Sequence, residues 1–177
     1  THDLTVTDIT DIDGTLAIAG NTLTLDGTSD IDGTITISTG IVDANGAFDA
    51  NSGFVTFTDA GNLNLSSTIT DLGTLSDNFG TVTYDGLNQT IFSDIYYSLT
   101  AGGGSGTKIL GGEVAVVGDF TVNANVTFDV SSISDYSVSI EGALENNGTF
   151  SAQEGMVTFN GSDNQVFTPG SSSYYNI

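Results

Sequence analysis

Two segments far apart in the sequence, DANGAFDANSGFVTF (residues 43–57) and ENNGTFSAQEGMVTF (residues 145–159), share one frame. Both place an acidic residue, Asn-Gly, Phe, Ala, Gly and Val-Thr-Phe at identical spacings, and they align without a gap. A second pair, residues 80–92 and 155–167, aligns with one insertion, and two adjacent tyrosines follow each copy. The motif Asp-Ile-Asp-Gly-Thr occurs at residues 11–15 and again at 30–34. Because chance is a poor explanation for this self-similarity, the chain is predicted to repeat one structural unit.

Apolar and polar residues alternate in short runs along the chain. A period of two predicts short strands with one buried face, and no stretch of about ten residues has the apolar period of a helix. The many Thr, Val, Ile, Phe and Tyr residues favour strands, while Gly, Asn and Asp favour turns. The predicted fold class is all-β. The predicted strands include residues 4–6, 16–18, 23–25, 35–37, 55–57, 82–84, 114–116, 126–128, 138–140 and 157–159.

The spacing of the repeats selects among all-β architectures. About 20 residues, with two or three short strands and tight corners, is the length of one coil of a parallel β-solenoid. A β-sandwich is the main alternative, but it does not require near-identical corners at such a spacing. We therefore expect one domain over residues 1–177, a right-handed parallel β-helix with Gly, Asn and Asp corners that begins and ends in mid-repeat. Residues 59–78 depart from the pattern, so a less regular coil is expected there.

Composition excludes several functions. The 177 residues include 22 Asp and Glu but one basic residue, Lys108, and the formal net charge of −21 argues against nucleic acid as a partner. No apolar run approaches the roughly 18 residues that would cross a bilayer, so membrane insertion is not expected. The chain has no Cys and one His, His2, so neither a Ser-His-Asp triad nor a multi-histidine metal site is expected. With no Arg or Trp to hold a sugar, the protein is predicted to be non-enzymatic, without catalytic residues.

Several motifs resemble repeats of large secreted bacterial surface proteins, similar to filamentous-haemagglutinin-type adhesins. That resemblance implies parallel β-helix stalks that are exported to the cell surface, and its motifs are corner and core residues rather than an active site. The motifs are Asp-Leu-Thr-Val (3–6), Gly-Thr-Leu (14–16), Asn-Thr-Leu-Thr-Leu (21–25), Asn-Gly-x-Phe (45–48), Gly-x-Val-Thr-Phe (53–57), Asn-Gly-x-x-Asn-Gln-x-Phe (160–167) and Tyr-Tyr-Asn-Ile (174–177).

The predicted function is a structural module or subunit, extracellular or on the cell surface, that forms a rod or filament by end-to-end stacking of β-coils. An adhesin stalk, a pilus-like fibre and a matrix fibre all fit this description. Residues 1–6 read as the continuation of the motif at which the chain stops. The expected partners are therefore copies of the protein, end to end, or adjacent repeats in one chain. The predicted interface residues are Leu4, Val6, Tyr174, Tyr175 and Ile177.

The repeated Asp-x-Asp-Gly motif raises the question of calcium. Asp11, Asp13, Asp30 and Asp32 supply carboxylate oxygens next to a tight turn, and Ca²⁺ takes six to eight oxygen ligands. The alternative is that each Asp-Gly is only a corner, in which Asp bonds its own backbone and Gly adopts a positive φ. No cofactor is required by either interpretation, and calcium is the one that the pattern allows.

Two further patterns concern the surface. Thr-x-Thr recurs in several runs, which suggests ice or carbohydrate binding as an alternative function if the threonines stack on one flat face. The other interpretation is that Thr is simply favourable on the solvent side of a strand. Five Asn-x-Ser/Thr sequons would accept glycans if the protein is exported through a glycosylating pathway, at Asn64, Asn88, Asn125, Asn147 and Asn160.

Overall fold

The structure is a computed structural model that describes residues 2–76, 78–174 and 177. All regular elements in these ranges are strands, and none is a helix. The chain divides into two compact units, residues 1–83 (unit 1) and 84–177 (unit 2). Strand β13, Thr81–Tyr84, crosses the boundary between them.

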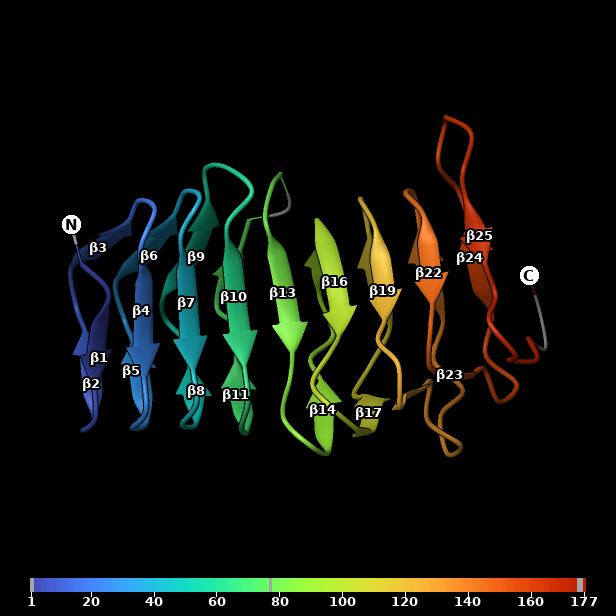
Figure 1. Cartoon of the computed structure of the whole chain (residues 1–177), viewed down its shortest axis with the longest axis horizontal. Helices are drawn as coiled ribbons and strands as arrows, with labels where there is room; N and C mark the ends of the chain where they lie inside the picture. The colour runs from blue at the N-terminus through green and yellow to red at the C-terminus, as the bar shows by residue number, and fades with distance from the viewer. Residues whose placement is uncertain (1, 77, 175–176) are drawn as a thin grey trace. The chain divides into compact units, whose positions relative to one another are not determined.

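Unit 1 consists of parallel coils, each of which passes through three faces in turn (Figure 1). Successive coils add one strand to each face, and the paired strands run parallel. The first face holds β1 (Leu4–Val6), β4 (Thr22–Leu25), β7 (Ile41–Ala44) and β10 (Asn62–Leu65). The second face holds β2 (Thr10–Ile12), β5 (Ser29–Ile31), β8 (Phe48–Asp49) and β11 (Ile69–Asp71). The third face holds β3 (Thr15–Ile18), β6 (Thr34–Ile37), β9 (Phe54–Phe57) and β12 (Thr74–Leu75).

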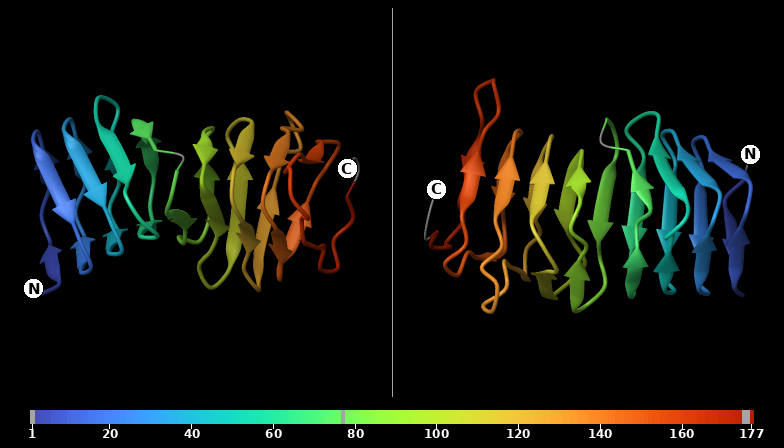
Figure 2. Two further views of the ribbon diagram at one scale, coloured as in Figure 1. Left: turned by 90° about the horizontal axis from the view of Figure 1, so that it is seen from above. Right: turned by 180° about the vertical axis from the view of Figure 1, so that it is seen from behind.

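Unit 2 has the same construction, and Figure 2 shows the strands of each unit from two further sides. Its first face holds β16 (Ser98–Ala101), β19 (Phe120–Val122), β22 (Leu144–Asn146) and β25 (Phe167–Thr168). The second face holds β14 (Gln89–Ile91), β17 (Gly106–Leu110), β20 (Val126–Asp129) and β23 (Thr149–Ser151). The third face holds β15 (Ile95–Tyr96), β18 (Val114–Val116), β21 (Val138–Ile140) and β24 (Val157–Phe159). The prediction of an all-β parallel solenoid is confirmed.

The alternation in the sequence becomes an alternation of burial. Parallel pairing in register places like residues above one another, so Leu23 pairs with Val42 and Val42 with Leu63, and all three are buried. In unit 2 the interior is aromatic: the ring centroids of Phe120 and Phe150 each lie 4.8 Å from that of Phe128. Each coil therefore buries its inward side chains against the coils on either side, which is the source of stability in a solenoid.

The frame shared by residues 43–57 and 145–159 is one complete coil. The two copies form β7–β8–β9 and β22–β23–β24, so each passes through the first, second and third faces in the same phase. Phe48 and Phe150 occupy the same position in the frame, and both are buried. The corner before the third strand is also the same, because Gly53 and Gly155 each donate a 2.8 Å backbone hydrogen bond to the buried Ala two positions after that Phe. The self-similarity thus marks the structural unit of the solenoid.

The second sequence pair shares a turn rather than a whole coil. Gln89 begins β14 on the second face, whereas Gln165 precedes β25 on the first face. In both copies the side-chain oxygen of the glutamine accepts a hydrogen bond from a turn glycine, Gly86 at 2.7 Å and Gly161 at 3.2 Å. The common feature is therefore a glutamine that closes its own corner.

Residues 59–78 do form a coil, through β10, β11 and β12. The expected irregularity appears as a shift of register between Ile69 and Asp71, where β11 pairs with β8. In the parts of the chain that the structure describes, no helix has the length and apolar character needed to cross a membrane.

Candidate functional site

The second face of unit 1 carries a row of carboxylates, which we call the aspartate ladder: Asp11, Asp30 and Asp49. Asp11 pairs with Asp30 and Asp30 with Asp49 in the parallel register, so their strands are about 4.8 Å apart at each step. The side chains point outward because the flanking Ile12 and Ile31 occupy the interior. The repeated Asp-Ile-Asp motif therefore stacks like charges on one face.

Asp30, in the middle of the aspartate ladder, has a raised pKa. Loss of solvation raises the pKa of Asp30 above its ordinary value, and the charges of Asp32, Asp11, Asp49 and Asp13 raise it further. The structure thus brings Asp11, Asp13 and Asp32, which were predicted from the sequence, and Asp49 in addition, close enough to Asp30 to repel its charge.

A metal centre requires more than proximity of charges. Among the described residues, no group of three or more His, Cys, Asp or Glu is arranged to hold a metal ion. Calcium binding stays a prediction, and it would need backbone carbonyls and water in addition to carboxylates. The corner interpretation has direct support at Gly33, where an added Cβ would collide with the carbonyl oxygen of Gly14 in the preceding coil. The expected positive φ is wrong for Gly14 and Gly33: the close approach of backbones, not a left-handed conformation, requires glycine at Gly33.

The predicted interface residues at the start of the chain lie on the outermost coil of unit 1. Leu4 in β1 is 57% exposed, and Val6 is half-buried. Leu4 lines an apolar cavity of about 250 Å³ together with Leu16, Ile18 and Leu23. Within the described part of the chain β1 is paired on one side only, with β4.

The predicted interface residues at the other end behave differently from one another. The ring of Tyr174 packs 5.0 Å from Phe150 and 5.2 Å from Phe167, and its hydroxyl accepts a 3.3 Å hydrogen bond from Asn146. Burial raises the pKa of Tyr174. Ile177 is 69% exposed, and Tyr175 lies outside the described residues. Tyr174 is therefore engaged within unit 2.

The five sequons fall into two groups. Asn88, Asn125, Asn147 and Asn160 are exposed in turns between strands, where a glycan would meet no steric barrier from the strand pairing. Asn64 is half-buried within β10, and its strand is paired with β7. Glycosylation stays a prediction at all five.

The Thr-x-Thr motifs do not form one regular array. Thr22 and Thr24 lie on the first face of unit 1, whereas Thr34 and Thr36 lie on the third. On the third face the two columns are interrupted, because Thr34 pairs with Phe54 and Thr36 with Ala17. A flat threonine surface of the kind that ice binding requires is therefore short at best.

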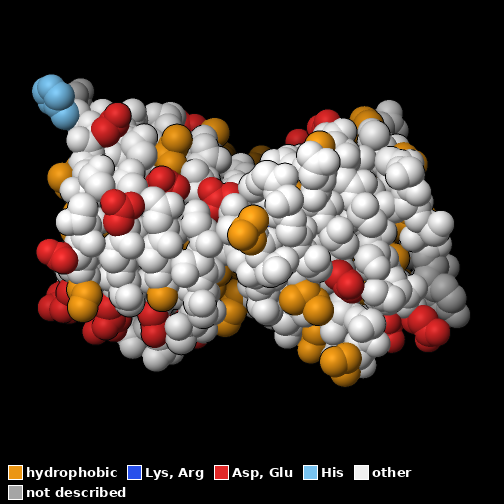
Figure 3. Space-filling view, turned by 60° about the horizontal axis from the view of Figure 1, so that its bottom comes forward, with side chains coloured by type: hydrophobic (Ala, Val, Ile, Leu, Met, Phe, Trp, Pro, Cys, Tyr) orange, Lys and Arg blue, Asp and Glu red, His pale blue; other side chains and the backbone are white. Residues whose placement is uncertain are grey.

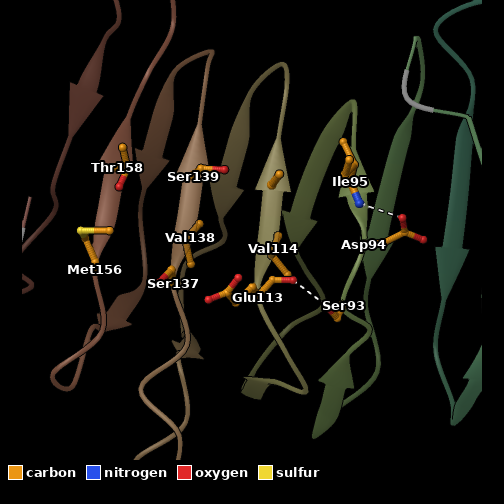
Figure 4. A pocket seen from close by; sticks show the side chains of 11 residues that line it. Ser93, Asp94, Ile95, Glu113, Val114, Ser137, Val138, Ser139, Met156 and Thr158 are labelled. Carbon is orange, nitrogen blue, oxygen red and sulfur yellow. Dashed lines mark hydrogen bonds between the residues drawn. The ribbon is translucent and has the colours of Figure 1, made fainter.

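Sequence reasoning missed a groove on the third face of unit 2, about 600 Å³ in volume. Its floor follows one register row across β15, β18, β21 and β24, and Figure 4 shows the side chains arrayed along these strands. The row consists of Ile95, Ala115, Ser139 and Thr158. Small outward side chains in adjacent coils are the signal that would have found it, but only with the register known.

The only basic side chain of the protein is inside it. Lys108 has no exposed surface, and its ammonium group donates hydrogen bonds to the carbonyl oxygens of Gly86 and Leu87, the latter at 3.0 Å. The surface in Figure 3 accordingly displays carboxylates and no lysine or arginine side chain. Any partner of the described surface meets a negative charge without a compensating exposed Lys or Arg.

Comparisons with models of protein families, with curated proteins and with solved structures find no match to this chain.

Proposed function

We propose that the protein is a structural, non-enzymatic module whose coils stack end to end on further coils of the same kind. The observation that carries this proposal is the outermost coil of unit 1. Its strand β1 has a free edge in the described chain, and Leu4, Leu16 and Ile18 leave apolar surface around a cavity of about 250 Å³. Unpaired strand edges are templates for another strand, and apolar surface favours its burial.

The corner glycines make the proposal specific. Gly33 is packed so closely on Gly14 that a Cβ would strike the Gly14 carbonyl oxygen, whereas nothing lies within 4 Å of the position that a Cβ would take on Gly14. A coil added at this edge in the same register would place its own backbone against Gly14. Glycine at this position is thus suited to receiving a coil, although the fold of the described chain does not require it.

The proposal includes an extracellular or cell-surface location, as an adhesin stalk, pilus-like fibre or matrix fibre. It is supported by the resemblance of the repeat motifs to secreted surface proteins and by the net charge of −21, which keeps neighbouring rods apart. Protease treatment of intact source cells tests the location, because an exposed solenoid would be cleaved or released without lysis. Full protection until lysis would contradict it.

Self-association of the purified chain tests the stacking. We expect mass to rise with protein concentration in light scattering and rods to appear in negative-stain electron microscopy. Gly14→Ala should weaken association about tenfold or more, because the methyl group blocks the incoming backbone. Gly104→Ala is the matched control, since Gly104 also has open space around it but lies in a turn of unit 2.

Two outcomes would contradict stacking between separate chains: monomers at every concentration, or equal association of Gly14→Ala and the unchanged protein. Stacking within one polypeptide is tested by joining two copies in tandem. If the coils stack, the tandem protein melts at a higher temperature than the single copy, and Gly14→Ala in the second copy removes the gain.

A further inference from the structure

We propose that the groove on the third face of unit 2 binds a short extended segment of a partner protein that carries a lysine or arginine. This site is separate from the coil edge that the proposed function uses, because every lining residue lies between Ser93 and Thr158. The length of the groove, the position of its charges and the position of its apolar side chains all fit such a segment.

The groove has the dimensions of a peptide site. Its floor crosses four strands, and three steps of about 4.8 Å give a length of about 14 Å, which is the span of about four extended residues. A volume of about 600 Å³ lies within the usual range of ligand pockets. The hydroxyls of Ser137, Ser139 and Thr158 line it and offer hydrogen-bond donors and acceptors to a peptide backbone.

Its charged groups are two carboxylates, Asp94 beside Ile95 and Glu113 between β18 and β21, where Figure 4 shows its side chain facing Ser137. Asp94 precedes β15 and is held in place by the backbone amide of Ile95, which donates a 2.7 Å hydrogen bond to it. Glu113 precedes β18 and is exposed, and its carboxylate accepts no hydrogen bond from any described residue. Because Lys108 is buried, no exposed Lys or Arg in the described chain competes for them. A cationic side chain is the complement of these carboxylates.

Apolar side chains mark the two limits of the groove. Ile95 at the β15 end is 49% exposed, and Met156 beside β24 is 51% exposed. Glu113 thus lies between these two apolar limits, and Met156 offers a flexible thioether that adapts to apolar partners. A peptide in which a basic residue stands beside apolar ones matches this arrangement, whereas a polyamine has no apolar side chains for Ile95 and Met156 to contact.

The test uses the full chain and a blocked hexapeptide in which lysine alternates with valine. Amide NMR shifts should move at Ala115, Ser139 and Thr158, and a fluorescent form of the peptide should report the affinity. Glu113→Gln and Asp94→Asn should each weaken binding about fivefold, since each removes one partly exposed charge pair. Asp30→Asn is the matched control, because it removes the same charge from the second face of unit 1. Ala115→Phe should abolish binding by filling the floor.

Several results would overturn the proposal. Equal losses for Asp30→Asn and Glu113→Gln would mean diffuse attraction to an acidic protein. Shifts confined to other faces, or no binding at all, would place no site in the groove. A peptide with glutamine in place of lysine that binds as tightly would remove the role of the carboxylates. Spermidine binding as tightly at the same amides would contradict an extended segment. Circular dichroism of each variant confirms that it is folded.

Discussion

At the scale of single residues, Lys108 is the side chain whose role the composition conceals. Lys108 is the one lysine beside 22 acidic residues, yet it lies inside unit 2 and donates hydrogen bonds to two backbone carbonyls. Burial lowers the pKa of Lys108, and the charge of Asp85 opposes that shift. Gln165 has the same role at another corner of unit 2, where its side-chain amide donates hydrogen bonds to the carbonyl oxygens of Ile140 and Gly142 at 2.8 and 3.0 Å. Both side chains satisfy carbonyls at corners between coils.

Replacing this lysine should therefore destabilise unit 2. Lys108→Met keeps much of the volume but leaves two carbonyl oxygens without a donor, and we expect a loss of about 1–3 kcal/mol in the free energy of unfolding. Urea unfolding measures it. Thr90→Val, an exposed site on the same face, should change stability by less than about 0.5 kcal/mol. Equal stability of Lys108→Met and the unchanged protein would show that water replaces the lysine without cost.

Asp30 should make the stability of unit 1 depend on pH. Because the folded state raises the pKa of Asp30, it binds a proton more tightly than the unfolded state does. The stability that this group contributes is present at low pH and is lost as the pH rises through its folded pKa. Asp30→Asn has no charge to repel, so it should melt above the unchanged protein near pH 7, with a difference that shrinks toward about pH 4.

Asp163→Asn, an exposed site in unit 2, is the control for removing one charge. Melting curves followed by circular dichroism at several pH values supply the measurement. A melting temperature of Asp30→Asn at or below that of the unchanged protein near neutral pH would contradict repulsion in the aspartate ladder.

At the scale of elements, the strands are too short to be stable alone. Contacts between successive coils stabilise them. Strands of two to five residues acquire partners only from the coils before and after them. The corners must then let backbones approach closely, and Gly33 lies against Gly14 for this reason. The same Asp-Gly-Thr motif at Gly14 has no coil on its outer side in the described chain, so nothing lies within 4 Å of the position that a Cβ would take there.

This difference predicts that replacing glycine by alanine destabilises the protein much more at Gly33 than at Gly14, although both lie in the same motif. Gly33→Ala should cost more than about 2 kcal/mol of unfolding free energy, because the backbones of two coils must separate. Gly14→Ala should change it by less than about 1 kcal/mol. Chemical unfolding of both variants under conditions where the protein is monomeric is the measurement. Similar losses at both positions would mean that the glycines serve the turn itself rather than the packing of coils.

At the scale of the whole molecule, charge is the dominant property. A net charge of −21 with the one lysine buried leaves a surface that repels itself. Raising sodium chloride from about 10 mM to about 300 mM shortens the screening length from about 30 Å to less than 10 Å, so the melting temperature should rise. For a chain of this size, each kcal/mol gained corresponds to about 2–4 °C.

Calcium chloride at the same ionic strength separates screening from binding. If the ladder binds calcium, the melting temperature should exceed that in sodium chloride, and both chelator and Asp30→Asn should remove the excess. Equal melting temperatures in the two salts would mean that calcium only screens the charges of the acidic corners and does not bind to them. A fall in melting temperature with added salt would contradict self-repulsion altogether.

Local patterns in the sequence were sufficient for the strands and for the coil. All ten predicted runs are strand residues, and the shared frame of residues 43–57 and 145–159 is one coil. These features follow from alternation with a period of two and from turn residues, both of which depend on neighbours in the chain. The stacking of Asp11 on Asp30 could also be predicted, because a motif that repeats after one coil places its equivalent residues above one another.

The remaining features depend on which residues meet between coils. The register pairs Leu4 with Leu23 in the next coil, 19 residues further along the chain, and Phe120 with Leu144, 24 residues further along. The length of a coil therefore varies from 19 to 24 residues between these places. Only this pairing places Ala115 beside Ser139 to hollow the groove, and only the folded corner places the carbonyls of Gly86 and Leu87 around Lys108. Alternation determined which side chains point inward. Contacts across coils, which no local pattern encodes, decided what those side chains and their outward neighbours form.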